Sequence, residues 1–138
     1  MNAFTYYMPA KVLFGKDCVM NNKEEFCALG KKALIFTGRR SAKLNGSLNN
    51  VTDALNAVGI GYAVFDEVEE NPSLETLEKA AKLGIAEEAD FVIGIGGGSP
   101  MDAAKGAAYL IANPEMSADM LMKDGTYRPI PIARLRTL

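Results

Sequence analysis

The chain has 138 residues, of which 49% are hydrophobic and 23% charged, and its formal net charge is −2 at pH 7. These values are typical of one globular domain with a buried core, and they give no electrostatic basis for binding nucleic acid or an anionic membrane. No apolar run approaches the length that spans a bilayer, and the first residues lack the layout of a signal peptide, so we expect a cytoplasmic protein.

The first part of the chain predicts a strand, a helix and a second strand. Residues 4–15 are rich in aromatic and β-branched side chains around Pro9, as in a strand or hairpin at a sheet edge. Residues 16–29 predict a helix that Gly30 would end. The short apolar run at 32–37 predicts a strand buried on both faces.

A polar stretch at 38–50 predicts a loop, and a helix with one apolar face follows it. The apolar positions of that helix are Leu48, Val51, Leu55 and Val58. The next strand is predicted at 61–68. Asn71 or Ser73 can then cap a helix that we expect over about 74–86.

A third strand is predicted at 91–95, followed by a helix that begins after Ser99 and runs to about residue 112, where an Asn-Pro pair would stop it. A short helix at 118–123 and a Pro-rich strand at 128–133 come last. Apolar strands alternating with amphipathic helices predict an α/β fold, a Rossmann-like parallel sheet with helices on both faces plus the N-terminal edge strand or hairpin. With no repeat or linker, residues 1–138 are expected to form one domain.

The stretch GIGGGSPMDAAK joins the third strand to its helix. Glycines let a ligand approach the main chain, and ligands of open α/β sheets bind at such strand ends. We predict Ser99 as the helix N-cap, Pro100 as the first helical residue and Asp102 as the capping-box partner of Ser99. The helix start would then favour a phosphate, such as a pyrophosphate. A tight packing corner without ligand is the alternative, since the stretch is neither G-x-G-x-x-G nor a P-loop.

This stretch closely resembles the GGGSxxDxAK segment of the iron-containing, or group III, alcohol dehydrogenase family. Ser99 favours the alcohol dehydrogenases over the related glycerol dehydrogenases and dehydroquinate synthases, which usually carry lysine there. The segments YYMPAKVLFG, KKALIFTG and VEENPS are also similar to family motifs, so the resemblance covers almost the whole chain. The matching residues of the glycine segment are Gly96, Gly97, Gly98, Ser99, Asp102, Ala104 and Lys105.

The resemblance implies a dinucleotide site. The cofactor pyrophosphate would lie on Gly97, Gly98 and Ser99. The neighbouring Gly96 belongs to the same loop, which Asp102 would help to shape. Asn71 would lie near the cofactor as well, although from the sequence alone it is equally well explained as a plain helix cap.

The residues after the strand at 32–37 concern the choice of cofactor. In the family, members that use NAD place an aspartate where this chain has Gly38, and its carboxylate bonds the adenine ribose. The residues expected to face the cofactor here are Gly38, Arg39, Arg40 and Ser41, with Lys43 further on. Loss of an acid and gain of guanidinium groups favour NADP(H) over NAD(H). A solvated basic loop is the alternative.

The chain also departs from the family pattern. Family members continue into a TTAGTGSE-like segment and a helical domain whose aspartate and three histidines hold Fe²⁺ or Zn²⁺, the Lewis acid of the reaction. Here residues 133–138, ARLRTL, form a tail unlike the family, and the sequence contains no histidine. Its cysteines, Cys18 and Cys27, form no C-x-x-C pair. We therefore predict no catalytic residue, no metal ligand and no metal-binding helical domain, and negligible activity of the chain alone.

Three functions stay open from the sequence. The first is the cofactor-binding half of an oxidoreductase that moves a hydride between NADP(H) and a small primary alcohol or aldehyde. The second is a nucleotide- or phosphate-binding module without catalysis, and the third is a structural domain. If apolar surface is left exposed, a homo-oligomer is also expected.

Overall fold

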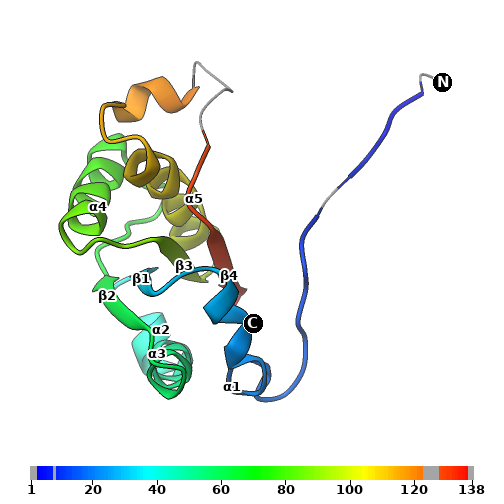
Figure 1. The fold of residues 1–138 in the computed structure, drawn as a ribbon. Helices are drawn as coiled ribbons and strands as arrows, with labels where there is room; N and C mark the ends of the chain where they lie inside the picture. The colour runs from blue at the N-terminus through cyan, green and yellow to red at the C-terminus, as the bar shows by residue number, and fades with distance from the viewer. Residues whose placement is uncertain (1–2, 8, 123–127, 137–138) are drawn as a thin grey trace.

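The computed structural model describes residues 3–7, 9–122 and 128–136, and its centre is a four-stranded parallel sheet (Figure 1). The strands are β1 (Lys32–Phe36), β2 (Gly61–Phe65), β3 (Phe91–Gly96) and β4 (Ile132–Arg136). They lie in the order β2-β1-β3-β4, and each neighbouring pair runs parallel. The predicted Rossmann-like α/β sheet is therefore confirmed.

Helices connect these strands and cover both faces of the sheet. Their bounds are α1 (Cys18–Asn21), the 3-10 helix η1 (Lys23–Ala28), α2 (Ser41–Leu44), α3 (Ser47–Ala57), α4 (Leu74–Ala86), α5 (Gly98–Ala112) and the 3-10 helix η2 (Ala118–Met122). The helix predicted over 74–86 is confirmed. Its N-cap is Ser73, whose side-chain oxygen accepts a hydrogen bond from the backbone N–H of Thr76 at 3.2 Å.

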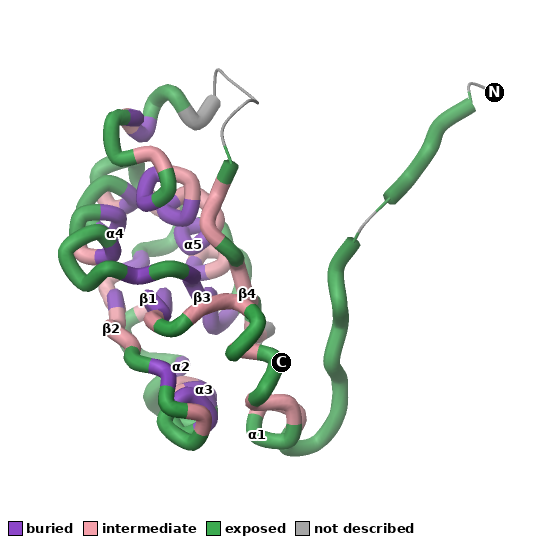
Figure 2. Tube along the Cα trace, viewed as in Figure 1, coloured by how far each residue is buried: buried purple, intermediate pink, exposed green. Residues whose placement is uncertain are grey.

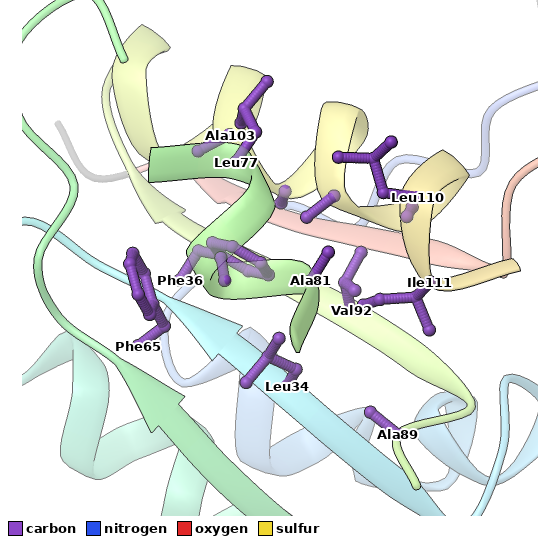
Figure 3. Close-up of a cluster of buried hydrophobic side chains, with 14 of the residues drawn as sticks. Leu34, Phe36, Phe65, Leu77, Ala81, Ala89, Val92, Ala103, Leu110 and Ile111 are labelled. Carbon is purple, nitrogen blue, oxygen red and sulfur yellow. The ribbon is translucent and has the colours of Figure 1, made fainter. Parts of the chain in front are cut away.

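The core consists of two apolar clusters, one on each face of the sheet. On one face, α4 and α5 pack over Leu34, Phe36 and Val92, as Figure 3 shows. On the other, α3 packs Val51 and Leu55 against residues that alternate with those along β1 and β3. Every residue of β3 is buried, which is why this strand is continuously apolar. In Figure 2 the buried positions follow the sheet and the inner sides of the helices.

Small residues let α5 lie close to the sheet. Four alanines on its inner face are fully buried: Ala103, Ala104, Ala107 and Ala108. Opposite them, a Cβ added to Gly94 of β3 would lie 3.0 Å from the Cα of Met101 and 3.1 Å from the carbonyl oxygen of Pro100. The glycine at position 94 is thus explained by helix–sheet packing within the chain.

A single carboxylate joins the amino ends of β1 and β3. Asp90 precedes β3, and its side chain accepts backbone N–H groups of Lys31, at 3.0 and 2.9 Å, and of Lys32, at 2.9 Å. A Cβ added to Gly30 would lie 2.2 Å from an Asp90 oxygen, so any other residue there would have to displace the Asp90 carboxylate. This arrangement, here called the Asp90 clamp, helps fix the register of the two central strands.

The prediction of an N-terminal edge strand or hairpin is wrong for the residues that the structure describes. Residues 3–7 and 9–14 form no strand, and the segment runs away from the sheet in Figure 1. Its apolar side chains are exposed, Phe4 by 85% and Phe14 by 90%. A strand needs a neighbour to pair with, and no described strand lies beside this segment, in which Pro9 also lacks an N–H donor.

Smaller differences concern element boundaries. The helix predicted over 16–29 is broken into α1 and η1, and the loop predicted over 38–50 contains α2. The strand predicted at 128–133 begins only at Ile132 and runs on to Arg136, through residues expected to form a tail. Its start lies after Pro129 and Pro131 because a proline cannot donate a hydrogen bond to the sheet. Residue 123 of the predicted short helix lies outside the described residues. No helix in the described part is long and apolar enough to cross a membrane.

Candidate cofactor-binding site

The order of the strands places a topological switch point between β1 and β3. The chain leaves β1 toward β2 on one side, then crosses back to β3 on the other side of β1. The carboxyl ends of β1 and β3 are adjacent, with Phe36 paired to Gly94. In open α/β sheets this topological switch point is where ligands bind. The two predicted site segments, 38–41 and 96–99, follow these two strands.

The glycines at the end of β3 and just after it differ in whether the fold requires glycine at their position. Gly96 has φ +132°, a backbone conformation that other residues rarely adopt. Gly97, with φ −85°, has no such requirement. A Cβ added to Gly97 or Gly98 would meet no atom within 4 Å. The fold therefore leaves open space over the main chain at these two residues, where the N-terminus of α5 presents unpaired backbone N–H groups.

The predicted capping of α5 is wrong. The helix begins at Gly98 with Gly97 as its N-cap, so Ser99 and Pro100 lie inside the first turn. Asp102 does not reach back to the loop. It pairs with Lys105 one turn along the helix, with 3.5 Å between Nζ and Oδ1, and it is 69% exposed. Because the helix begins two residues earlier than predicted, the side chain of Ser99 is not used as the cap and contacts another segment.

That segment is the turn at Asn71. The backbone N–H of Asn71 donates to Oγ of Ser99 at 3.4 Å, a long hydrogen bond that joins two parts of the predicted site. Asn71 has φ 53°, in the left-handed region that asparagine tolerates better than most residues. Since Ser73 is the cap of α4, Asn71 is not a plain helix cap.

Glu69 holds this turn in place, and the sequence analysis did not identify it. Its carboxylate accepts the backbone N–H of Ser73 at 2.7 Å and the hydroxyl of Thr76 at 2.6 Å. These hydrogen bonds lower the pKa of Glu69 below its ordinary value, the Thr76 hydroxyl contributing most. An acid four residues before a helix N-cap is a signal that could have indicated such a link.

The basic residues after β1 lie around the start of α2. Arg39 and Arg40 are exposed, and Ser41 is the first residue of α2. Lys43 forms an ion pair with Asp66, which directly follows β2 and was also missed. The hydrogen bond from Lys43 lowers the pKa of Asp66, and the nearby charge of Arg39 adds to the effect. The predicted basic loop therefore has an acid beside it.

Other features of the structure do not mark this switch point as a site. A shallow hollow of about 250 Å³ is lined by residues around α1, α3 and β4, and none of the predicted site residues line it. Within the described ranges, no three or more histidine, cysteine, aspartate or glutamate side chains gather where they could hold a metal ion.

The fold and the glycine turn at the switch point define a Rossmann-like domain. The chain belongs to the iron-containing alcohol dehydrogenase family, whose sequence profile matches residues 9–138. A probable NADH-dependent butanol dehydrogenase of Bacillus subtilis is 39% identical over 108 residues, 78% of this chain and 28% of that protein. The NADPH-dependent aldehyde reductase YqhD of Escherichia coli is 36% identical over 115 residues, 83% of this chain and 29% of that protein.

Solved structures agree with this assignment. The crystal structure of an iron-containing alcohol dehydrogenase from Thermotoga maritima superimposes with a TM-score of 0.93 at 38% identity. The match covers 98% of this chain and 38% of that one. The chain thus spans well under half the length of the relatives it matches. Those relatives include both NADH- and NADPH-dependent enzymes.

Proposed function

We propose that this chain forms the cofactor-binding portion of an NADP(H)-dependent, metal-dependent alcohol dehydrogenase. The reaction would transfer a hydride between a primary alcohol or aldehyde and the nicotinamide. The observation that best supports the proposal is the open main chain at Gly97 and Gly98, placed at the topological switch point. A packing corner without ligand would give these glycines no role, because no atom of the fold approaches them.

The chain's own residues would bind and orient the cofactor. Unpaired N–H groups in the first turn of α5 would donate to the pyrophosphate, as its negative charge is favoured at a helix N-terminus. Ser99 and Asn71, which contact each other, would close one side of the site. The dinucleotide when bound supplies the hydride donor or acceptor, and the protein supplies position and electrostatics.

The basic segment after β1 would set the preference for NADP(H). Gly38 offers no carboxylate to the adenine ribose, and a side chain there would meet only the carbonyl oxygen of Val68, at 3.9 Å. The exposed guanidinium groups of Arg39 and Arg40 suit bidentate pairing with a 2′-phosphate. The hydroxyl of Ser41 would donate a further hydrogen bond.

The metal of the family does not fit the residues present. The sequence has no histidine, and the described residues contain no cluster of candidate ligands. We therefore propose that the 138 residues alone bind dinucleotide without turning over alcohol, and that metal ligands would have to come from outside this chain. This observation also favours a second candidate function, a nucleotide-binding module with no catalysis of its own.

The test is a titration of the purified chain with NADPH and NADH, followed by nicotinamide fluorescence and by calorimetry. We expect NADPH to bind more tightly, and Arg39→Ala or Arg40→Ala to weaken NADPH while leaving NADH nearly unchanged. Lys31→Ala, which removes one positive charge at the opposite end of β1, is the matched control. Tighter binding of NADH would contradict the phosphate site, and binding of neither dinucleotide would contradict the cofactor-binding function.

A second assay separates binding from catalysis. The same preparation would be incubated with NADP⁺, butanol or propanediol, and either Fe²⁺ or Zn²⁺, and reduction of the nicotinamide followed by absorbance. We expect no turnover above the rate without protein. Metal-dependent turnover would show that the chain does provide a catalytic centre.

A further inference from the structure

Asp66 lies beside the proposed 2′-phosphate site. It directly follows β2, and two backbone hydrogen bonds continue the pairing of β1 and β2 past the strand ends. Thr37 donates its N–H to the carbonyl of Phe65 at 3.0 Å, and Val68 donates to the carbonyl of Thr37 at 3.4 Å. Continuing the register of Phe36 with Phe65, position 66 lies opposite Thr37, the residue before Gly38, where the family's ribose-binding acid is missing here.

The carboxylate of Asp66 is paired with a residue of the basic segment. Lys43, two residues after Ser41, donates its ammonium group to Oδ2 of Asp66. The side chains are 47% and 42% exposed, so each remains accessible to solvent and to a ligand. Arg39 is close enough to act on the charge of Asp66 as well. Lys43, a cation that could pair with a phosphate, is thus already paired with the Asp66 carboxylate.

We propose that Asp66 is a positioning residue that sets the preference between phosphorylated and unphosphorylated dinucleotides by competing with the 2′-phosphate for Lys43. This inference rests on the proposed function. In the absence of ligand the Asp66–Lys43 pair holds the ammonium at the rim of the site. A 2′-phosphate, with more negative charge and three acceptor oxygens, must displace Asp66 to gain Lys43, and its own charge is repelled by the carboxylate that remains.

The effect is moderate because the pair is half-exposed. An exposed ion pair contributes a factor of up to about five to an equilibrium constant. Removing the charge of Asp66 should therefore tighten NADPH about two- to five-fold. NADH lacks the phosphate that competes for Lys43, so its affinity should not change measurably.

The experiment compares dissociation constants for NADPH and NADH on the full 138-residue chain and its variants. We expect Asp66→Asn to raise the NADH-to-NADPH ratio of dissociation constants about two- to five-fold, and Lys43→Gln to lower it by a similar factor. In the Lys43→Gln background, Asp66→Asn should have a smaller effect, because the cation for which it competes is gone. Asp66→Glu keeps the carboxylate and should therefore retain the preference of the natural chain.

The adjacent acid provides a matched control. Glu67 forms its own ion pair with Lys79 at 2.8 Å and is similarly exposed, at 46%. Glu67→Gln removes the same charge one residue away and is expected to leave the ratio unchanged. If it shifts the ratio as much as Asp66→Asn does, the effect is one of net charge and the specific role of Asp66 is wrong.

Three other outcomes would overturn the inference. An unchanged ratio in Asp66→Asn, with both dinucleotides bound and the unfolding temperature retained, would show that Asp66 plays no part in selection. Weaker NADH binding with unchanged NADPH would mean that Asp66 accepts the ribose hydroxyls instead. Failure of the natural chain to bind either dinucleotide would refute the proposed function, and this inference with it. If Asp66→Asn does not fold, Lys43→Gln alone decides, since an unchanged ratio there contradicts the competition.

Discussion

Removing the Asp90 clamp should measurably destabilise the fold. The Asp90 carboxylate accepts backbone N–H groups from two residues at the start of β1. A hydrogen bond to a charged group contributes about 1.5–3 kcal/mol, and bonds that share one carboxylate are not additive. Because this carboxylate is exposed, water replaces part of what is lost, and we expect Asp90→Ala to cost about 2 kcal/mol in the free energy of unfolding. At roughly 4 °C per kcal/mol for a domain of this size, the unfolding temperature should fall by about 8 °C.

The glycine beside the clamp gives the sharper test. A Cβ at position 30 would lie 2.2 Å from the Asp90 carboxylate, so Gly30→Ala must displace that side chain and break the same hydrogen bonds. In the Asp90→Ala background there is no carboxylate to displace, and Gly30→Ala should cost much less. Unfolding by denaturant and by heat would be followed by circular dichroism for the two single variants and the double variant.

A control variant separates the stability lost with the backbone hydrogen bonds from the stability lost with a surface charge. Glu87 pairs with the ammonium of Lys32 at 3.3 Å, and Glu87→Gln should change stability by no more than about 0.5 kcal/mol, as for other exposed pairs. The reasoning fails if Asp90→Ala is no more destabilising than Glu87→Gln. It also fails if the effects of Gly30→Ala and Asp90→Ala simply add in the double variant.

Three further predictions concern other parts of the fold. Gly94→Ala should cost about 1–3 kcal/mol by overpacking β3 against α5, whereas Gly98→Ala should leave stability intact and weaken dinucleotide binding; thermal unfolding and calorimetry on both variants would show whether these two losses are separate. The depressed pKa of Glu69 implies stability that is present above pH 4.5 and is lost as the pH falls through the lower folded-state pKa; Glu69→Gln should flatten that part of the stability–pH curve, and a curve unchanged by the substitution would contradict this. The exposed Phe4 and Phe14 should promote self-association, so sedimentation should show less association for the Phe4→Ser/Phe14→Ser double variant than for the natural chain, and equal association would rule the segment out.

The central sheet could be predicted because its signals are local. Strand β3 is continuously apolar, and α4 has both its cap at Ser73 and a clear helical period. The glycines at the end of β3 likewise predict a cofactor site at this end of the sheet, and that stays a prediction. Each of these features depends on residues that are close together in the sequence, and the periodicity of apolar side chains reports such features directly.

The contacts that shape the site depend on residues far apart in the sequence. Asp66 and Lys43 are separated by 23 residues and Asn71 and Ser99 by 28, so no local pattern could pair them. The error at Ser99 has a different cause. A serine before a proline is a good cap by preference, but after the tight turn at Gly96 the helix begins two residues earlier. The N-terminal segment was predicted as a strand from its composition, which cannot report whether a pairing partner exists.

The order of the strands also determines when the switch point can form during folding. Strands β1 and β2 are joined by one helical connection and can pair early, but the switch point exists only after β3 has docked on the other side of β1. That step closes a long stretch of chain, since the Asp90 clamp alone joins residues 59 apart, and such closures are slow. A ligand held between the two loops would bind only the product of this late step. It would therefore act by slowing the separation of β3 from β1, and would leave the rate at which they first meet unchanged.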